Sequence, residues 1–144
     1  MIILDTNVLS ELMRPQPNPG VIAWVASRPR ASLYTTSISQ AEILYGIGTL
    51  PKGRRRDNLV ATAEAMFSED LAGRVLPFNS AAAAHYAAIV VGRRESGNPI
   101  EAFDALIAAT ALAAGAAGVA THDLSGFEAC GLAKLVNPWN APLS

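Results

Sequence analysis

Short runs of almost entirely apolar residues recur along this chain and alternate with longer segments whose patterning is helical. The runs lie at residues 1–4, 33–36, 74–78, 118–121 and 135–136. A strand that is apolar along its whole length, rather than at every second residue, needs cover on both of its faces, as in parallel sheets. The chain is therefore predicted to have an α/β fold, a three-layer sandwich with a mainly parallel central sheet and helices on both faces.

Capping and stop signals predict six helices around these strands. They cover roughly residues 7–13, 19–27, 52–69, 80–96 and 100–114, and one further segment that Ser37 or Ser39 caps and Pro51 ends. Asn18 before a proline is typical of a helix start, and Pro99 is expected at the start of the last helix. The helix from residue 52 is expected to begin with a basic run.

The composition fits one folded domain, which we expect to span residues 1–144. The chain is 51% hydrophobic and 16% charged, so disorder is excluded. The weakly polar stretch at 105–120 is too short and too weakly hydrophobic for a membrane span, and the first residues lack the features of a signal peptide. One cysteine, Cys130, allows no internal disulfide, which fits the cytoplasm, the compartment we expect.

The net charge of −1 does not by itself indicate nucleic-acid binding, but the positive charges are clustered. Four basic residues lie within five positions: Lys52, Arg54, Arg55 and Arg56. Such a patch can bind RNA phosphates. A solvated helix start, or contact with an acidic partner segment, explains the run equally well, and these alternatives stay open here.

Four acidic residues stand out by their context. Asp5 and Asp123 follow the first and fourth predicted strands, while Glu42 and Asp104 lie in helices that are otherwise apolar around them. In a parallel sheet the carboxyl ends of the strands meet at one edge, where ligands bind. The four carboxylates are therefore expected to gather there, although each alone has an ordinary explanation as a cap, a turn or a surface residue.

Carboxylates at one place repel one another, and either protonation or a cation must relieve the repulsion. Oxygen ligands favour Mg²⁺ or Mn²⁺. The spacing of His85, His122 and Cys130 does not indicate zinc. Since an acid-bound Mg²⁺ activates water against a phosphoryl group, the pattern predicts hydrolysis of a phosphate ester.

The same acids lie in segments that resemble the motifs of the PIN-domain ribonuclease family, in order and along almost the whole chain. The segments are Ile-Leu-Asp-Thr-Asn at 3–7, Ser-Ile-Ser-Gln-Ala-Glu at 37–42 followed by Tyr-Gly, Phe-Asp-Ala-Leu-Ile-Ala-Ala-Thr-Ala at 103–111, Val-Ala-Thr-His-Asp at 119–123 and Asn-Pro-Trp at 137–139. Within the family the chain is most similar to the VapC and FitB group of bacterial toxins.

This resemblance implies a PIN-like sandwich and an endoribonuclease that is the toxin of a toxin–antitoxin pair. It implies Mg²⁺, with Mn²⁺ as a substitute, held by Asp5 and Asp104, with Glu42 and Asp123 completing the catalytic set. It further implies RNA as the substrate, a cognate antitoxin as the partner, and a homodimer with no membrane association.

The fourth motif departs from the pattern of many members, which carry Thr-Arg-Asn-x-x-Asp-Phe there. Here Gly126 replaces the last acid, and Asp123 occupies the Asn position. A carboxylate is kept but shifted by three residues, as in members similar to FitB. The direct role of Asp123 is therefore less certain than that of Asp5 or Asp104.

Polar neighbours of the acids are candidates for supporting roles. Thr6, Asn7 and Thr121 are expected to orient Asp5 through hydrogen bonds, or else to bond the backbone of their turns. Glu101 is expected to be a first-turn surface acid. His122 flanks Asp123 and can reach a substrate.

Other function classes fit less well. A haloacid-dehalogenase-type phosphatase needs Asp-x-Asp after the first strand, whereas residues 5–7 read Asp-Thr-Asn. A receiver domain needs an acceptor acid after the third strand, and residues 77–79 supply none. The remaining alternative is a catalytically silent PIN-like scaffold that binds nucleic acid or protein.

Overall fold

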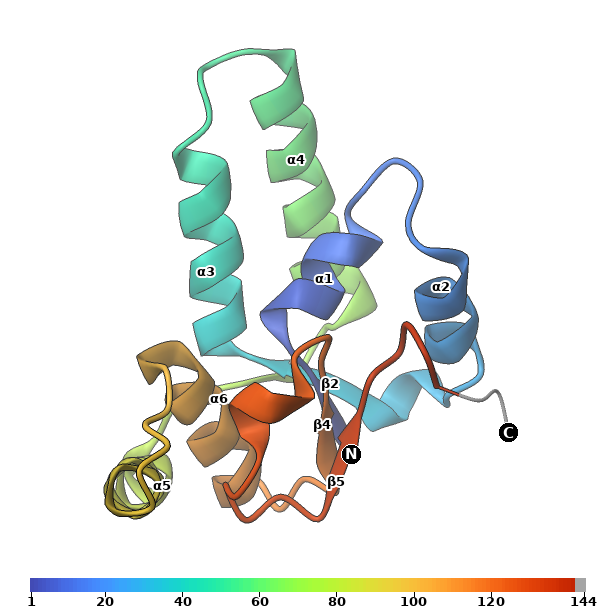
Figure 1. Cartoon of the computed structure of the whole chain (residues 1–144). Helices are drawn as coiled ribbons and strands as arrows, with labels where there is room; N and C mark the ends of the chain where they lie inside the picture. Colours follow the sequence, from blue (N-terminus) through green and yellow to red (C-terminus); the bar gives the residue numbers. More distant parts are fainter. Residues whose placement is uncertain (142–144) are drawn as a thin grey trace.

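The computed structural model describes residues 1–141, and it is built around a five-stranded, entirely parallel sheet (Figure 1). The strands run in the order β3-β2-β1-β4-β5. Their bounds are Ile2–Leu4 (β1), Leu33–Thr36 (β2), Val75–Leu76 (β3), Gly118–Ala120 (β4) and Lys134–Val136 (β5). The first strand of the chain, β1, lies at the centre of the sheet, so the residue that follows it lies in the middle of the carboxyl edge.

Six α-helices connect the strands, as expected from the sequence. They are Thr6–Leu12 (α1), Pro19–Ala26 (α2), Ser37–Gly48 (α3), Arg54–Ala65 (α4), Ser80–Glu95 (α5) and Ala102–Ala113 (α6). Short helical turns lie at Arg30–Ser32 (η1), Met66–Asp70 (η2) and Leu124–Phe127 (η3). The predicted α/β architecture is confirmed. The expected domain runs to residue 144, and residues 142–144 lie outside the described part.

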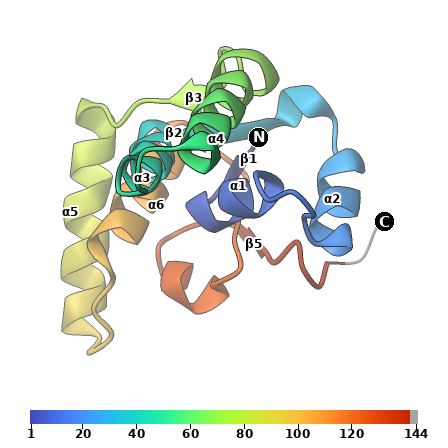
Figure 2. The same cartoon turned by 90° about the horizontal axis from the view of Figure 1, so that it is seen from above.

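Two hydrophobic cores lie on opposite faces of the sheet, which explains why the strands lack an alternating pattern. Leu4 of β1 and Ala120 of β4 belong to the core shared with α1 to α4. Ile3 and Val119, one residue earlier on the same strands, belong to the core shared with α5 and α6. Successive side chains of a strand point to opposite faces, so both faces must be apolar here. Figure 2 shows α5 and α6 on one side and α1 and α2 on the other.

Three helix starts differ from the expectation. Thr36, and neither Ser37 nor Ser39, caps α3, because the Thr36 hydroxyl accepts the N–H of Ser39. The last helix starts at Ala102 rather than at Pro99, because the Glu101 carboxylate accepts the N–H of the third helical residue. Helix α4 begins at Arg54 rather than at residue 52, so Lys52 precedes the helix.

Helices α3 and α4 run side by side and rise away from the sheet, joined at their far ends by residues 49–53 (Figure 1). The basic run therefore lies at the tip of this helical hairpin. At its other end α4 widens into the π-helical turn η2, which packs Met66 and Phe67 into the core. Among the described residues no helix is long and apolar enough to cross a membrane.

Candidate active site at the carboxyl edge of the sheet

Asp5 lies at the centre of the carboxyl edge, where β1 ends and α1 begins. Its backbone N–H donates to Ala120 O (2.9 Å), which continues the β1–β4 ladder by one residue. Its carboxylate caps α1 by accepting the N–H of Thr6 at 2.7 Å. Only 5% of the residue is exposed. Burial raises the pKa of the Asp5 carboxyl, against the opposing effect of its hydrogen bonds.

The second oxygen of Asp5 is held by Thr121, which directly follows β4. The fully buried Thr121 hydroxyl donates to Asp5 Oδ2 at 2.8 Å. The same hydroxyl oxygen accepts from Asn7 Nδ2 (3.2 Å) and from the N–H of Asp123 (3.1 Å). Thr121 thus bonds Asp5 directly and Asn7 reaches it through Thr121, while both side chains also accept a backbone N–H of the turn after β4.

Glu42 reaches the site from the second turn of α3. The Thr6 hydroxyl donates to Glu42 Oε1 at 2.7 Å and lies 2.9 Å from the Ser39 hydroxyl. Ser39 is fully buried. Its role as a partner of Thr6 is not visible in the sequence, because it depends on how closely α1 and α3 approach.

Asp104 lies in the first turn of α6 and is half-buried. Burial raises the pKa of its carboxyl to about 7, and the charges of Asp5 and Glu101 add to the effect. Within the described residues no hydrogen-bond donor reaches this carboxylate. Asp104 is therefore the acidic group whose negative charge is least compensated.

Asp123 differs from the other three acids in its exposure and in its hydrogen-bond partners. It is exposed, and its carboxylate caps η3 by accepting from Ser125 Oγ (2.7 Å) and from the N–H of Gly126 (3.3 Å). Its charge still raises the pKa of Asp5 and of Asp104. A Cβ atom on Gly126 would lie 2.9 Å from Asp104 Oδ2 and 3.0 Å from Asp123 Oδ2. The glycine in the fourth motif thus leaves room for two carboxylates.

One pocket of about 590 Å³ brings most of the predicted residues together. Its lining includes Asp5, Thr6, Asn7, Glu42 and Asp104, whereas Asp123 and Thr121 are not part of it. Across residues 1–141 no three His, Cys, Asp or Glu side chains already form a metal-binding group. The site is thus an open acidic hollow with two fixed carboxylates and one uncompensated one.

The donor set of this hollow fits a hard divalent cation better than any other common cofactor. Its ligands would be oxygens only, and Mg²⁺ commonly binds one or two carboxylates and keeps several waters. Such binding does not require three preformed protein ligands. A cation there would favour the charged form of Asp104, whose pKa is raised by burial and by the neighbouring acids. The residues present therefore fit a magnesium or manganese ion.

The structure adds two aromatic residues to the wall of the pocket. The rings of His122 and Trp139 stack with centroids 4.2 Å apart and planes inclined by 15°, and both residues line the same hollow as the acids. The sequence suggested that His122 could reach a substrate, but it did not reveal the stack. The contact forms because the tail after β5 returns across the exit of β4.

Positive charge lies along one side of the same hollow. The Arg14 side chain is 66% exposed and forms an ion pair with Glu11 at 3.3 Å. It lines both the acidic pocket and a neighbouring hollow of about 700 Å³, which Arg54 and Arg55 also line. A basic path therefore leads from the acids toward the start of α4, where the clustered basic residues lie.

Comparison with known proteins agrees with this architecture. The model of the PIN domain family matches residues 2–129. Over 139 residues the chain is 43% identical to VapC ribonuclease Y4jK of Sinorhizobium fredii, covering 96% of this chain and 98% of the relative. It is 41% identical over 140 residues to toxin FitB of Neisseria gonorrhoeae, covering 97% and 99%. The structure of FitAB bound to an IR36 DNA fragment matches with a TM-score of 0.86 at 39% identity, covering 99% of this chain and 98% of that one.

Proposed function

Because this chain belongs to the PIN-domain family and is similar over almost its whole length to its VapC and FitB members, we propose that it is a Mg²⁺-dependent endoribonuclease, the toxin of a toxin–antitoxin pair. The observation that carries the proposal is the acidic hollow at the carboxyl edge, where Asp5, Glu42 and Asp104 line one pocket. Relatives named as a ribonuclease and as a toxin support the reaction and the role.

The side chains of the hollow divide into ligands and supports. Asp5 and Asp104 would hold the cation, with Mn²⁺ able to replace Mg²⁺. The chemistry supplied by a bound divalent cation is Lewis acidity toward a phosphodiester and water. Thr121 and the N–H of Thr6 keep Asp5 in one orientation. Glu42, held by the Thr6 hydroxyl, is the carboxylate placed to accept a proton in the pocket.

The test is cleavage of a mixed RNA pool by purified, partner-free protein with Mg²⁺, with Mn²⁺ and with excess chelator. Asp5→Asn and Asp104→Asn keep the size of each side chain and remove its charge. We expect metal-dependent cleavage by the wild type and its loss in both variants. Cleavage that survives both the chelator and the substitutions would contradict the four-carboxylate proposal.

The silent-scaffold alternative has a distinct outcome. A folded wild-type protein that binds metal and RNA but leaves every RNA intact would favour it. The presence of an acid in each of the four motifs favours the enzyme. Cytoplasmic location remains a prediction of both.

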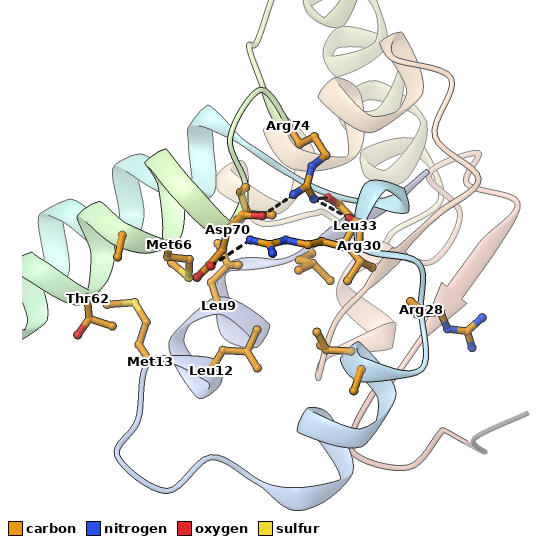
Figure 3. A pocket seen from close by; sticks show the side chains of 15 residues that line it. Leu9, Leu12, Met13, Arg28, Arg30, Leu33, Thr62, Met66, Asp70 and Arg74 are labelled. Carbon is orange, nitrogen blue, oxygen red and sulfur yellow. Dashed lines mark hydrogen bonds and ion pairs between the residues drawn. The ribbon is translucent and has the colours of Figure 1, made fainter.

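An antitoxin partner is proposed because structural relatives were solved as FitAB and VapBC assemblies. A separate hollow of about 710 Å³ between α1, α2 and α4 suits its binding segment. Figure 3 shows Leu9, Leu12 and Met66 toward the hollow, with Arg30 and Arg74 across it. Arg30 pairs with Asp70 at 3.3 Å on the exposed side of the hollow. An apolar segment would bury its side chains here.

A homodimer is proposed from apolar side chains exposed on α3 and α6. Tyr45 is 76%, Leu44 51% and Phe103 48% exposed. The two helices that carry these side chains are in contact with each other. Covering such residues with a second copy would remove apolar area from water.

A further inference from the structure

The stack of His122 on Trp139 is anchored on one side and open on the other. Trp139 packs against the core that α1, α2 and α4 share. His122 is exposed, and both residues line the acidic pocket. The imidazole therefore lies at the open side of the stack, supported by the indole.

A chain of three hydrogen bonds fixes the stack relative to Asp5. The backbone N–H of His122 donates to Asn7 Oδ1 at 3.1 Å, and Asn7 Nδ2 donates to Thr121 Oγ1 at 3.2 Å. The Thr121 hydroxyl donates to Asp5 Oδ2 at 2.8 Å. The backbone of His122 is thus linked to the Asp5 carboxylate by hydrogen bonds, and the imidazole ring itself is held by its stack on Trp139.

A contact that served only to pin the chain's tail would gain by burying both rings, since the hydrophobic effect rewards area removed from water. Here His122 stays exposed beside the acidic pocket. Flat rings bind other flat rings face to face, and an unpaired nucleobase presents such a face, whereas a base inside a duplex is already stacked on both sides.

We propose that the His122–Trp139 stack is a binding subsite for one unpaired nucleobase of the RNA, next to the phosphate that lies at the carboxylates. This inference rests on the proposed function. The base stacks on the exposed imidazole and extends the pair to three rings. The subsite selects for an unpaired base and not for its identity, because every base has the same kind of face.

The test is a double-mutant cycle between the protein and the RNA. The probe is an unstructured RNA octamer, with a set of octamers that each carry one abasic nucleotide at a different position. Binding is measured by anisotropy in an Asp104→Asn background with Mg²⁺, so that the RNA stays intact. We expect one abasic position to weaken binding about tenfold, within the range for loss of one base stack.

His122→Ala should weaken binding of the intact octamer by the same factor. In this variant an abasic nucleotide at the sensitive position should cause no further loss of affinity. His122→Phe keeps a flat ring and should restore both the affinity and the sensitivity. The matched control is His85→Ala, which removes the chain's other histidine, exposed on α5. It should leave all affinities unchanged.

Equal abasic penalties in the His122→Ala protein and its parent, or an unchanged affinity after His122→Ala, would overturn the subsite. Metal-dependent cleavage of the same octamer by the wild type is measured alongside. If cleavage occurs without coupling between base and ring, only the subsite is wrong. If the protein neither binds nor cleaves the octamer, both the subsite and the proposed function are wrong.

Discussion

Asp104 is the residue on which the electrostatic cost of the site is concentrated. The ordinary pKa of its carboxyl is 3.8, whereas burial and nearby acids raise the pKa in the folded protein to about 7. Between these values the folded state retains a proton that the unfolded chain has released. The free energy of unfolding of the metal-free protein therefore falls as pH rises through this window.

Asp104→Asn should consequently stabilise the metal-free protein at pH 8 and have little effect at about pH 3, below both pKa values, where the carboxyl is mostly neutral in both states. Because solvent screens a half-buried group, we expect a gain on the order of 1 kcal/mol, which for a domain of this size is roughly 2–4 °C in Tm. Thermal unfolding in chelator at the two pH values measures it. If the variant is less stable than the wild type at pH 8, the ionised Asp104 carboxylate does not lower the free energy of unfolding, and this account is wrong.

Gly126→Ala tests the space between two carboxylates. The added Cβ would meet Asp104 Oδ2 at 2.9 Å and Asp123 Oδ2 at 3.0 Å, closer than normal contact. Both oxygens must move, so we expect Mn²⁺ affinity to fall by about tenfold, the lower end for disturbed ligand positioning, with the fold retained. Gly92→Ala on α5, which has nothing within 4 Å of its Cβ position, is the control. Unchanged Mn²⁺ affinity in calorimetry would refute this account.

The residues that sequence reasoning identified are those whose roles follow from position along the chain. Asp5 and Thr121 directly follow strands of a parallel sheet, so their place at one edge follows from the topology alone. The partnership of Ser39 with Thr6, and the stack of Trp139 on His122, depend on how separate segments pack. No local pattern carries that information.

At the scale of elements, Arg93 of α5 ties two loops to the site. It is 4% exposed, and its guanidinium donates to Asn98 O (2.8 Å), Gly126 O (3.0 Å) and Glu128 O (3.0 Å). One of these loops precedes α6, which carries Asp104, and the other contains η3. The buried cation thus joins the segments on both sides of the acidic pocket.

Arg93→Met should therefore destabilise the protein by about 3 kcal/mol, because three carbonyls lose their charged donor in a buried setting. Urea unfolding measures the loss, and the buried Cys130 beside Arg93 should become reactive to thiol reagents. Arg94→Met, one residue along on the exposed face, should cost less than about 0.5 kcal/mol. Equal stability of the two variants would contradict the role of Arg93.

The basic residues at the start of α4 are placed to bind RNA phosphates. Arg54 and Arg55 line a hollow together with Arg14, which also lines the acidic pocket. Replacing both by Ala should weaken binding of single-stranded RNA and flatten the dependence of log affinity on log salt by about 0.7 per lost phosphate contact. An unchanged slope would assign these arginines to solvent or to the antitoxin instead. Arg94→Ala is the control.

The alternation of strands and helices was predictable because each element carries its own periodicity and stop signals. The residues at which helices start were harder to predict. Thr36 at the end of β2 caps α3, and Glu101 caps α6 and so shortens it. In each case a neighbouring residue could have capped the helix instead. The π-turn after α4 forms where Met66 and Phe67 fill the core, which is a tertiary effect.

At the scale of the whole molecule, the surfaces proposed for RNA, for the antitoxin and for a second copy are formed by different sets of residues. The acids lie at the carboxyl edge, the apolar hollow lies between α1, α2 and α4, and Tyr45 and Leu44 are exposed on α3. A substitution on α3 can therefore separate subunit association from metal binding, because Asp5 and Asp104 belong to other elements.

Tyr45→Glu combined with Leu44→Glu places two like charges in the proposed interface. Burying unpaired charges is costly, so we expect the protein to sediment as a monomer at concentrations where the wild type is a dimer. The fold and the Mn²⁺ affinity should be retained, because neither side chain is buried. Ile22→Glu, at a residue that is also exposed but lies on α2, should leave the dimer intact. A wild-type protein that is monomeric at every concentration would refute the dimer, whereas a dimer that tolerates both charges would assign its interface to a different face.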